Sequence, residues 1–195
     1  ASLGEKPATP SQFRKYFDVP LKKYYMALGL DEQRIIKNSV EMSNVFHKTY
    51  EKAAEKTRTR AFAKDVLEWL GENNIPAIII SNHVEDKINF HLKRLNLSSY
   101  FESVEGNDSL ISPMKERNKK ERLKTYLSGK NFEKDEVLLV GDSVEEIEIA
   151  KELQILSVAI TQGNVSTARL KNAKPDYLID NLGSLKNIIT KINKI

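Results

Sequence analysis

The sequence predicts an α/β protein in which a parallel sheet has helices on both faces and follows a small, all-helical cap. From about residue 59 onward, short apolar runs alternate with amphipathic helical segments, a pattern typical of right-handed crossovers in a parallel sheet. The runs at 75–80 and 137–140 are continuously apolar, as strands buried on both faces require. Before residue 59 only helical periodicity is present. We therefore expect a helical cap with an N-terminal linker over 1–58 and an α/β core over 59–195.

The cap is expected to contain three helices. Ser11 can cap a short first helix, and a second can run from Pro20 to a stop at Gly29. Asp31 can cap a third, long helix, because apolar residues recur every three or four positions over 35–53.

The core is expected to contain five strands. Helices with leucine or isoleucine at helical spacing separate them, and the last helix ends the chain. The expected strands are 75–80, 101–105, 137–140, 158–160 and 177–179.

Composition excludes several classes of function. The 195-residue chain has no cysteine, which excludes disulfides, thiolate metal sites and cysteine nucleophiles, and a cytoplasmic location is expected. No apolar run approaches the roughly 18 to 20 residues that cross a bilayer, so no membrane partner is expected. The net charge is +4, but the lysines are scattered over helices instead of forming one basic block. This distribution argues against nucleic acid as a partner.

Polar groups follow the two continuously apolar runs. Ser81 and Asn82 follow the first run, and Asp142 follows the second, with Glu146 one helical turn later. Such groups meet at the carboxyl edge of a parallel sheet, where ligands bind. Taken alone, Ser81 is better explained as a cap of the helix that begins near Val84 than as a phosphate ligand. The two carboxylates could share a hard cation, or they could suit the start of a helix.

A lysine-rich segment lies between these two positions. Lys115 and Lys119 are both near the expected start of a helix, where a lysine could point toward the crevice and neutralise phosphate. Most lysines of this segment must face solvent.

Together these motifs resemble the haloacid dehalogenase-like superfamily of phosphohydrolases. The sequence IIISN over 78–82 is similar to its serine motif, and LVGDSVEE over 139–146 to its acidic motif. NKKERL over 118–123 resembles the family's lysine motif. PDYLID over 175–180 resembles the C-terminal segment of phosphoglycolate-phosphatase-like members of the family. The resemblance implies a Rossmann-like core with a helical cap, and it spans about residues 60–182.

The resemblance also implies roles for individual residues. Ser81 and Asn82 would bind the phosphoryl group, and Lys119, or failing it Lys115, would hold phosphate and orient the nucleophile. Asp142 would anchor Mg²⁺. The reaction would be hydrolysis of a small phosphorylated metabolite through an aspartyl-phosphate.

Glu146 is the second residue expected at the metal ion. It is one methylene longer than the aspartate that the family usually shows there. A dehalogenase is a weaker alternative to the phosphatase, because the acidic pair suits a metal-dependent phosphatase better.

The family's nucleophile motif is absent. That motif, Asp-x-Asp, follows a strand that precedes the cap, and no Asp-x-Asp occurs in this sequence. Residues 1–10 contain two prolines and two charged residues and cannot form a buried strand. Two hypotheses follow: a phosphatase whose nucleophile segment is missing from the sequence, or a non-catalytic relative that binds a phosphate ligand or a protein partner.

The missing strand gives a structural expectation. In the fold that the chain resembles, it lies between 77–80 and 137–140. An empty slot would expose unpaired backbone groups, at about 1–3 kcal/mol for each buried one, against a total stability of about 5–15 kcal/mol. We therefore expect a segment outside residues 1–195, from upstream or from a separate peptide, to fill the slot with an apolar strand that ends in Asp-x-Asp.

Overall fold

The computed structural model describes residues 6–108 and 119–193. The described part of residues 1–58 contains four helices, and the structure differs from the expected three at two points. Thr9, not Ser11, caps the first helix, through reciprocal hydrogen bonds with Gln12. The expected long helix is divided at Asn38, whose side chain donates a hydrogen bond to the Arg34 carbonyl at 2.8 Å and so competes with helix continuation. The helices are α1 (Pro10–Tyr16), α2 (Leu21–Ala27), α3 (Glu32–Lys37) and α4 (Ser39–Ala54).

The remaining elements alternate as predicted. The strands are β1 (Ile78–Val84), β2 (Ser103–Asn107), β3 (Leu138–Gly141), β4 (Leu156–Ile160) and β5 (Tyr177–Ile179). The α-helices are α5 (Ala63–Glu72), α6 (Glu85–Arg94), α8 (Lys119–Ser128), α9 (Val144–Leu153), α10 (Thr167–Asn172) and α11 (Ser184–Asn193), with short 3₁₀ turns η1 (Ser98–Tyr100) and η2 (Lys134–Glu136). The first strand begins three residues later than expected and continues through Ser81 and Asn82, so these polar residues belong to the strand itself. None of the helices in the described ranges is long and apolar enough to cross a membrane.

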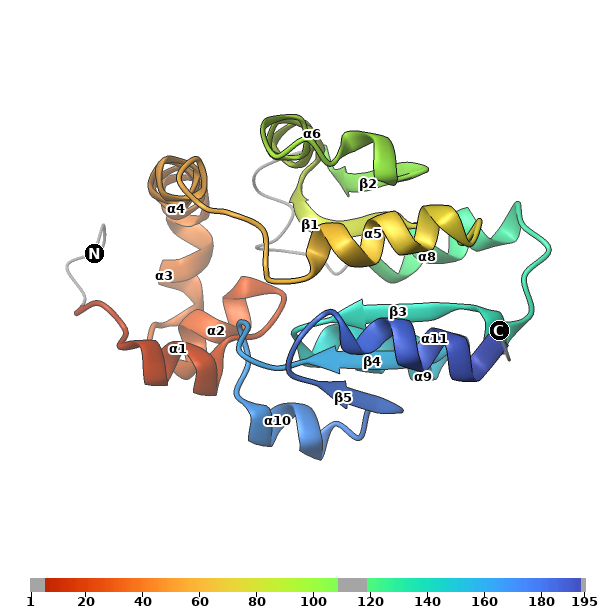
Figure 1. The fold of residues 1–195 in the computed structure, drawn as a ribbon. Helices are drawn as coiled ribbons and strands as arrows, with labels where there is room; N and C mark the ends of the chain where they lie inside the picture. Colours follow the sequence, from red (N-terminus) through yellow and green to blue (C-terminus); the bar gives the residue numbers. More distant parts are fainter. Residues whose placement is uncertain (1–5, 109–118, 194–195) are drawn as a thin grey trace.

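The strands form two separate parallel sheets (Figure 1). In one, β1 pairs with β2, with Ile79 opposite Val104. In the other, β4 lies between β3 and β5, with Val158 opposite both Val140 and Tyr177. The parallel α/β class predicted from the alternating pattern is therefore confirmed.

Helices cover both faces of the β3–β4–β5 sheet. On one face, α5 and α11 bring Val66 and Leu185 against Val158 and Ile160. On the other, α8 and α9 bring Leu123 and Ile149 into a cluster that also includes Ile80 of β1. The same helices therefore reach residues of both sheets.

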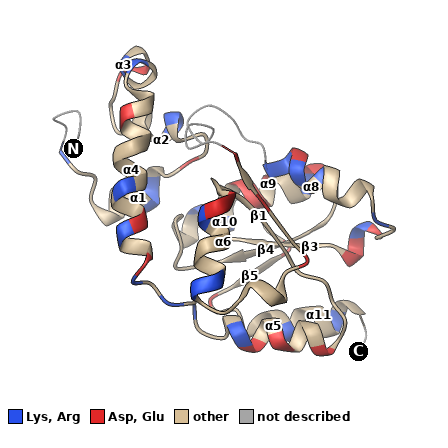
Figure 2. Ribbon diagram, turned by 90° about the horizontal axis from the view of Figure 1, so that it is seen from above, with Lys and Arg blue, Asp and Glu red and all other residues tan. Residues whose placement is uncertain are grey.

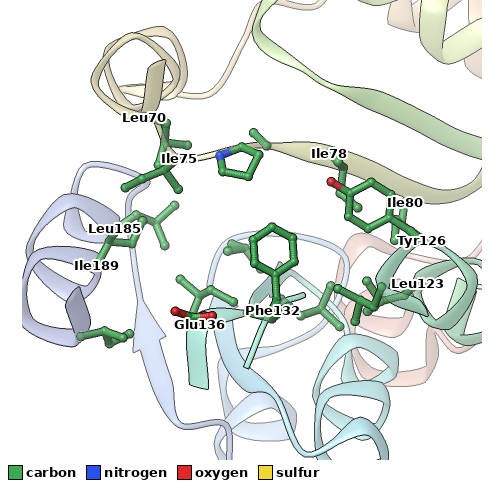
Figure 3. A pocket seen from close by; sticks show the side chains of 18 of the residues that line it. Leu70, Ile75, Ile78, Ile80, Leu123, Tyr126, Phe132, Glu136, Leu185 and Ile189 are labelled. Atoms are coloured by element: carbon green, nitrogen blue, oxygen red, sulfur yellow. The ribbon is translucent and has the colours of Figure 1, made fainter. Parts of the chain in front are cut away.

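β1 and β3 lie on opposite sides of a gap (Figures 1 and 3). Within the described residues, no strand pairing joins them. A cavity of about 310 Å³ lies between them, lined on one side by Ile78 and Ile80 and on the other by Leu139 and Val140. Every residue of β1 and β3 is only half-buried, whereas four of the five residues of β4 are buried. The two strands expected to be buried on both faces thus each have one open edge.

The N-terminal helices contact the core directly. Phe17 packs into a cluster around Ile147 and Leu170, and its carbonyl accepts a hydrogen bond from Arg169 Nη1 at 2.6 Å. The Arg14 carbonyl accepts another from Ser166 N at 3.2 Å. The first helix is therefore fixed to α10.

Candidate active site at the carboxyl ends of β1 and β3

Lys119 is the first residue of α8, and its ammonium group is buried against two carboxylates. Nζ lies 3.1 Å from Glu145 Oε2 and donates a shorter hydrogen bond to Glu146 Oε1. Both glutamates are in the first turn of α9 and are buried. Figure 2 shows this acidic start of α9 close to β1 and α8.

The ion pair between Lys119 and Glu146 favours the charged form of both side chains. Burial acts to lower the pKa of Lys119, but the carboxylates of Glu146 and Glu145 outweigh it and raise the pKa. Burial acts to raise the pKa of Glu146, but Lys119 and the hydrogen bonds from Ser143 outweigh it and lower the pKa. Lys119 and Glu146 therefore both stay ionised at neutral pH.

Glu146 is also part of the helix cap. Its Oε2 accepts hydrogen bonds from Ser143 N at 3.0 Å and Ser143 Oγ at 2.6 Å, which completes a capping box. A side chain on residue 141 would collide with Glu146, so Gly141 is needed for this close approach. Both oxygens of Glu146 thus have protein partners.

A second network connects β1 and β2 to the same place. Arg122 Nη1 donates to the Ser81 carbonyl at 3.1 Å, and Arg122 Nη2 donates to Asn107 Oδ1. Asn107 Nδ2 donates to the Asn82 carbonyl at 2.6 Å, and Asn82 Nδ2 donates to Glu145 Oε2 at 2.7 Å. Polar side chains therefore connect the two sheets at their carboxyl ends.

Asp142 lies beyond β3, next to the loop that follows β4. Its Oδ2 accepts a hydrogen bond from Asn164 N at 3.0 Å, and a Cβ on Gly163 would collide with its carboxylate. Burial raises the pKa of Tyr50 of α4, and the charges of Glu51 and Asp142 add to this effect. The cap helix therefore faces the same end of the sheet as Asp142.

A sequence model of the family described as "Haloacid dehalogenase-like hydrolase" matches residues 1–160. The chain belongs to this family. The resemblance read from residues 78–82 and 139–146 is thereby confirmed.

Several relatives of the chain are named as phosphatases or pyrophosphatases. A protein from Caldanaerobacter subterraneus, named as a candidate PpaX pyrophosphatase, is 27% identical over 89% of this chain and 76% of its own length. A phosphoglycolate phosphatase from Pseudomonas fluorescens is 26% identical over 94% of this chain and 68% of its own. Another from Synechococcus elongatus is 25% identical over 66% of this chain and 58% of its own. The chain thus spans between 58% and 76% of the length of these relatives.

Solved structures of the family share the fold. A predicted phosphatase from Clostridium acetobutylicum superposes with a TM-score of 0.78 at 19% identity, covering 100% of this chain and 86% of that chain. A haloacid dehalogenase-like protein from Streptococcus pneumoniae gives 0.76 at 21% identity, covering 96% and 85%. At these identities the similarity shows the fold alone.

Not all of the expected site residues can be placed. Lys119, Glu146 and Asn82 are brought together through Glu145, whereas Lys115 lies outside the described residues. The roles assigned to them stay predictions.

Ser81 does not cap a helix. Helix α6 begins at Glu85, and its N-cap residue is Val84. The hydroxyl of Ser81 instead accepts a hydrogen bond from His83 N at 3.1 Å. Its predicted role as a phosphate ligand is untested.

Sequence reasoning missed Glu145, Asn107 and Arg122 as members of the site. The acidic density after Asp142 was a signal for Glu145, although nothing showed which glutamate would turn inward. Arg122 lies within the segment 118–123 that resembles the lysine motif, but nothing local indicates its contacts or marks Asn107, because these contacts join residues 15 to 41 positions apart.

Two buried acceptor atoms at this site are unsatisfied. Among the described residues, neither Glu145 Oε1 nor Asn82 Oδ1 has a hydrogen-bond partner. Such atoms normally find a donor or a cation, because leaving one unpaired costs about 1–3 kcal/mol. Carboxylate and amide oxygens of this kind suit Mg²⁺ and its bound water, since Mg²⁺ uses one or two carboxylates and keeps several waters.

Proposed function

We propose that the protein is a Mg²⁺-dependent phosphatase of small phosphorylated metabolites, completed by a strand that fills the gap between β1 and β3. The open edges of β1 and β3 carry this proposal. Within the described residues, each strand has one edge without a strand partner that faces an apolar cavity, and a parallel strand between them would pair with both. The carboxyl end of such a strand would lie between Asn82 and Asp142. We propose that this segment supplies the aspartate that becomes phosphorylated.

Charges at the site support a requirement for metal. Lys119 and Arg122 contribute two positive charges, while Asp142, Glu145 and Glu146 contribute three negative charges. The phosphate of a substrate would therefore meet a net negative site. A bound divalent cation reverses this sign and stabilises the negative charge that develops on the phosphoryl oxygens.

The chain's own residues would have distinct tasks. We propose that Asp142 holds the metal ion and that Ser81 and Asn82 bind phosphate oxygens. Lys119 would hold the phosphate and orient the nucleophile. Glu146 as a direct metal ligand stays a prediction, and ligation would require it to exchange its contact with Lys119.

The two parts of the chain would also have distinct tasks. We propose residues 1–58 as a cap and 59–195 as the catalytic core lacking one strand. The cap would close over substrate and exclude water. The absence of cysteine is consistent with a cytoplasmic location.

Peptide complementation tests this function. Purified protein is first analysed by intact mass for a co-purifying peptide, and the coding sequence upstream of Ala1 is read for an apolar run that ends in Asp-x-Asp. That segment, or in its absence a designed one, is added as a synthetic peptide with p-nitrophenyl phosphate and Mg²⁺. We expect turnover with the Asp-x-Asp peptide and none with an Asn-x-Asn peptide, without Mg²⁺, or with Asp142→Asn.

The alternative function has a different outcome. In a non-catalytic relative, both peptides would bind with equal affinity and neither would restore hydrolysis. Calorimetry of peptide binding separates this result from a peptide that fails to bind. Protection of β1 and β3 from hydrogen exchange shows whether a bound peptide occupies the gap.

A further inference from the structure

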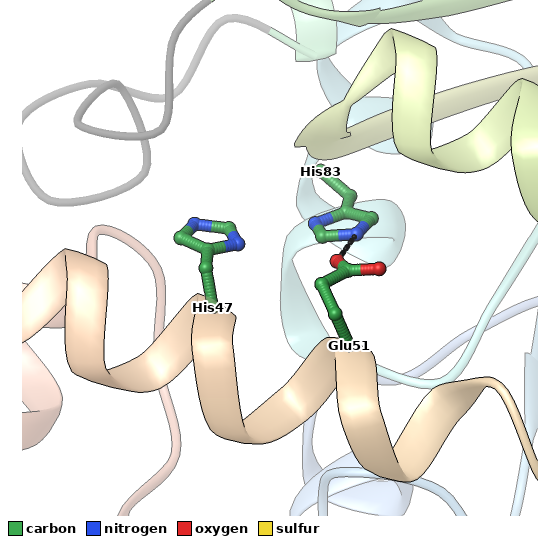
Figure 4. A group of neighbouring side chains, drawn as sticks. All are labelled: His47, Glu51 and His83. Atoms are coloured by element: carbon green, nitrogen blue, oxygen red, sulfur yellow. Dashed lines mark ion pairs between the residues drawn. The ribbon is translucent and has the colours of Figure 1, made fainter.

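All three histidines of the chain lie around one carboxylate, that of Glu51. His47 and Glu51 are one turn apart on α4, and therefore on the same side of that helix. His83 comes from the end of β1, and His91 comes from α6. Figure 4 shows His47, Glu51 and His83 pointing toward one another. His47 and His83, which are 36 positions apart in sequence, thus lie close together around Glu51.

The distances suit shared coordination. His83 Nε2 lies 2.8 Å from Glu51 Oε1, and His91 Nε2 lies 3.1 Å from Glu51 Oε2. The ligand atoms of His47, Glu51 and His83 all lie within 4.8 Å of one another. Tetrahedral ligands at about 2.0–2.1 Å from a zinc ion are about 3.3 Å apart. Small side-chain rotations would bring the three atoms to that separation.

The cluster is largely removed from water. His47 is 7% exposed, and the side chains of Glu51 and His83 are 16% and 20% exposed. In the described parts of the chain, the ion-pair partners of Glu51 are His83 and His91, and neither is a permanent cation. A carboxylate at this depth requires a compensating positive charge.

Protein groups around the cluster would also support ligation. The His47 and His83 rings are stacked, with centroids 5.4 Å apart and planes 13° apart. Tyr50 packs edge-on against His83. Burial lowers the pKa of His83, Glu51 opposes this effect, and His47 and His91 reinforce it. The neutral imidazole is the form that binds metals.

We propose that His47, Glu51 and His83 form a binding site for a divalent transition-metal ion such as Zn²⁺. Two imidazoles and one carboxylate form a common three-ligand set for zinc, with further positions for water or a ligand. His91 is a positioning residue, because its hydrogen bond to the second oxygen of Glu51 fixes the carboxylate's orientation. Imidazole ligands select zinc and similar ions, whereas Mg²⁺ prefers carboxylates and water.

The site would connect the helical cap to the core. His47 and Glu51 belong to α4, while His83 belongs to β1 and lies two residues beyond Ser81. A bound ion would therefore hold α4 against the end of β1. This inference does not depend on the proposed phosphatase function, because its ligands exclude Asp142 and the gap between the sheets.

Cobalt spectroscopy of the purified chain tests the site. Co²⁺ in a low-coordinate nitrogen and oxygen site absorbs in the visible range, and Zn²⁺ should displace it with loss of the band. Calorimetry with Zn²⁺, in the presence of enough Mg²⁺ to fill the strand-end site, should show one equivalent bound. Glu51→Gln, His47→Ala and His83→Ala should each abolish the cobalt band. His91→Gln should retain the band and weaken Zn²⁺ affinity about 10- to 100-fold, which is the usual effect of losing a residue that is hydrogen-bonded to a metal ligand.

Two controls separate this site from others. Glu55→Gln changes an exposed glutamate one turn after Glu51 and should leave Zn²⁺ affinity unchanged. Asp142→Asn should also leave it unchanged. Circular dichroism confirms that each variant is folded, and for the wild type Zn²⁺ should raise the Tm in a concentration-dependent way.

Three results would overturn the proposal. One is the absence of a cobalt band and of a Zn²⁺-dependent Tm shift in the wild-type chain. Another is unchanged Zn²⁺ affinity in folded Glu51→Gln and His83→Ala variants. The third is loss of the band in Asp142→Asn, which would place the ion at the strand-end site instead.

Discussion

β3 and β4 are neighbouring strands of similar composition in very different surroundings. β4 is paired on both edges, by β3 and β5, and four of its five residues are buried. Among the described residues β3 is paired on one edge only, and all four of its residues are half-buried, as are those of β1 across the gap. An apolar sequence thus allows a strand to be buried, but whether it is buried depends on the strands beside it.

The open region is held together by different interactions from the closed one. Around β4, backbone ladders and apolar clusters connect the elements. Between β1 and β3 the described residues form no backbone ladder, and polar side chains add to the apolar cluster around Leu123, through Lys119 with Glu145 and Glu146 and through Asn82 with Glu145. Such polar bridges depend on each partner, so single substitutions there should have large effects.

Hydrogen exchange should give the largest contrast between the two regions. Amides of β4 should open with free energies approaching that of global unfolding, about 5–15 kcal/mol. Amides of β1 and β3 that face the gap should exchange with little protection, because no strand in the described structure accepts from them. NMR-detected exchange on the purified chain measures both. Equal protection of 156–160 and 138–141 would show that the gap is already filled.

Lys119→Met should have the next largest effect. It leaves Glu145 and Glu146 buried without their cation, and removal of one partner of a buried ion pair costs about 3–5 kcal/mol. Urea denaturation at pH 7 measures the loss. Lys120→Met is the matched control, since Lys120 pairs with Glu152 at the exposed surface and should change stability little.

The loss of stability in Lys119→Met should depend on pH, and the direction follows from the pKa of Glu146. The folded-state pKa of Glu146 is lowered, so its stabilising contribution is present above the ordinary carboxyl value of about 4.3 and is lost as pH falls through the lowered value. The deficit of Lys119→Met should therefore shrink as pH falls below about 4.3. A deficit that is constant with pH would contradict the ion-pair explanation. Adding Glu146→Gln to Lys119→Met should recover part of the stability at pH 7.

A pair of isoleucines tests burial directly. Ile160→Ala in β4 removes a buried side chain and should cost about 2–5 kcal/mol. Ile80→Ala in β1 should cost roughly half as much, because Ile80 already borders the cavity and loses fewer contacts. With the complementing strand peptide bound, the two costs should become similar. An equal cost in the isolated chain would contradict the open-edge description.

The fold was largely predictable because strand and helix periodicities are local. Five strands and the parallel class follow from the apolar runs, with boundaries displaced by up to four residues for β1. The break at Asn38 was missed, since helical periodicity continues across it and only a side-chain hydrogen bond interrupts the helix. The half-burial of β1 and β3 was also outside the local pattern, because it depends on a neighbouring strand.

The candidate site was predictable only where a motif is contiguous. Asp142 and Glu146 follow β3 in one segment with Gly141, so their position after that strand follows from sequence. Glu51 and the three histidines come from three elements, and nothing in their spacing indicates that they meet. Convergence of this kind is set by packing of the cap on the core.

Substitution of Asp176 should give the smallest effect on stability, and it tests the region around β4, where the strands are paired on both edges. Its Oδ2 accepts hydrogen bonds from Ser157 N at 2.8 Å and Ser157 Oγ at 2.6 Å, which join β4 to the segment before β5. Burial acts to raise the pKa of Asp176, but the hydrogen bonds from Ser157 outweigh it and lower the pKa. The carboxylate's contribution is therefore present above the usual value of about 3.9 and is lost as pH falls through the lowered value. Because Asp176 is exposed, Asp176→Asn should cost at most about 1 kcal/mol at pH 7, and this difference should vanish near pH 2. Thermal unfolding at the two pH values measures it, and a loss at pH 7 as large as that of Lys119→Met would show that the closed region also depends on single polar bridges.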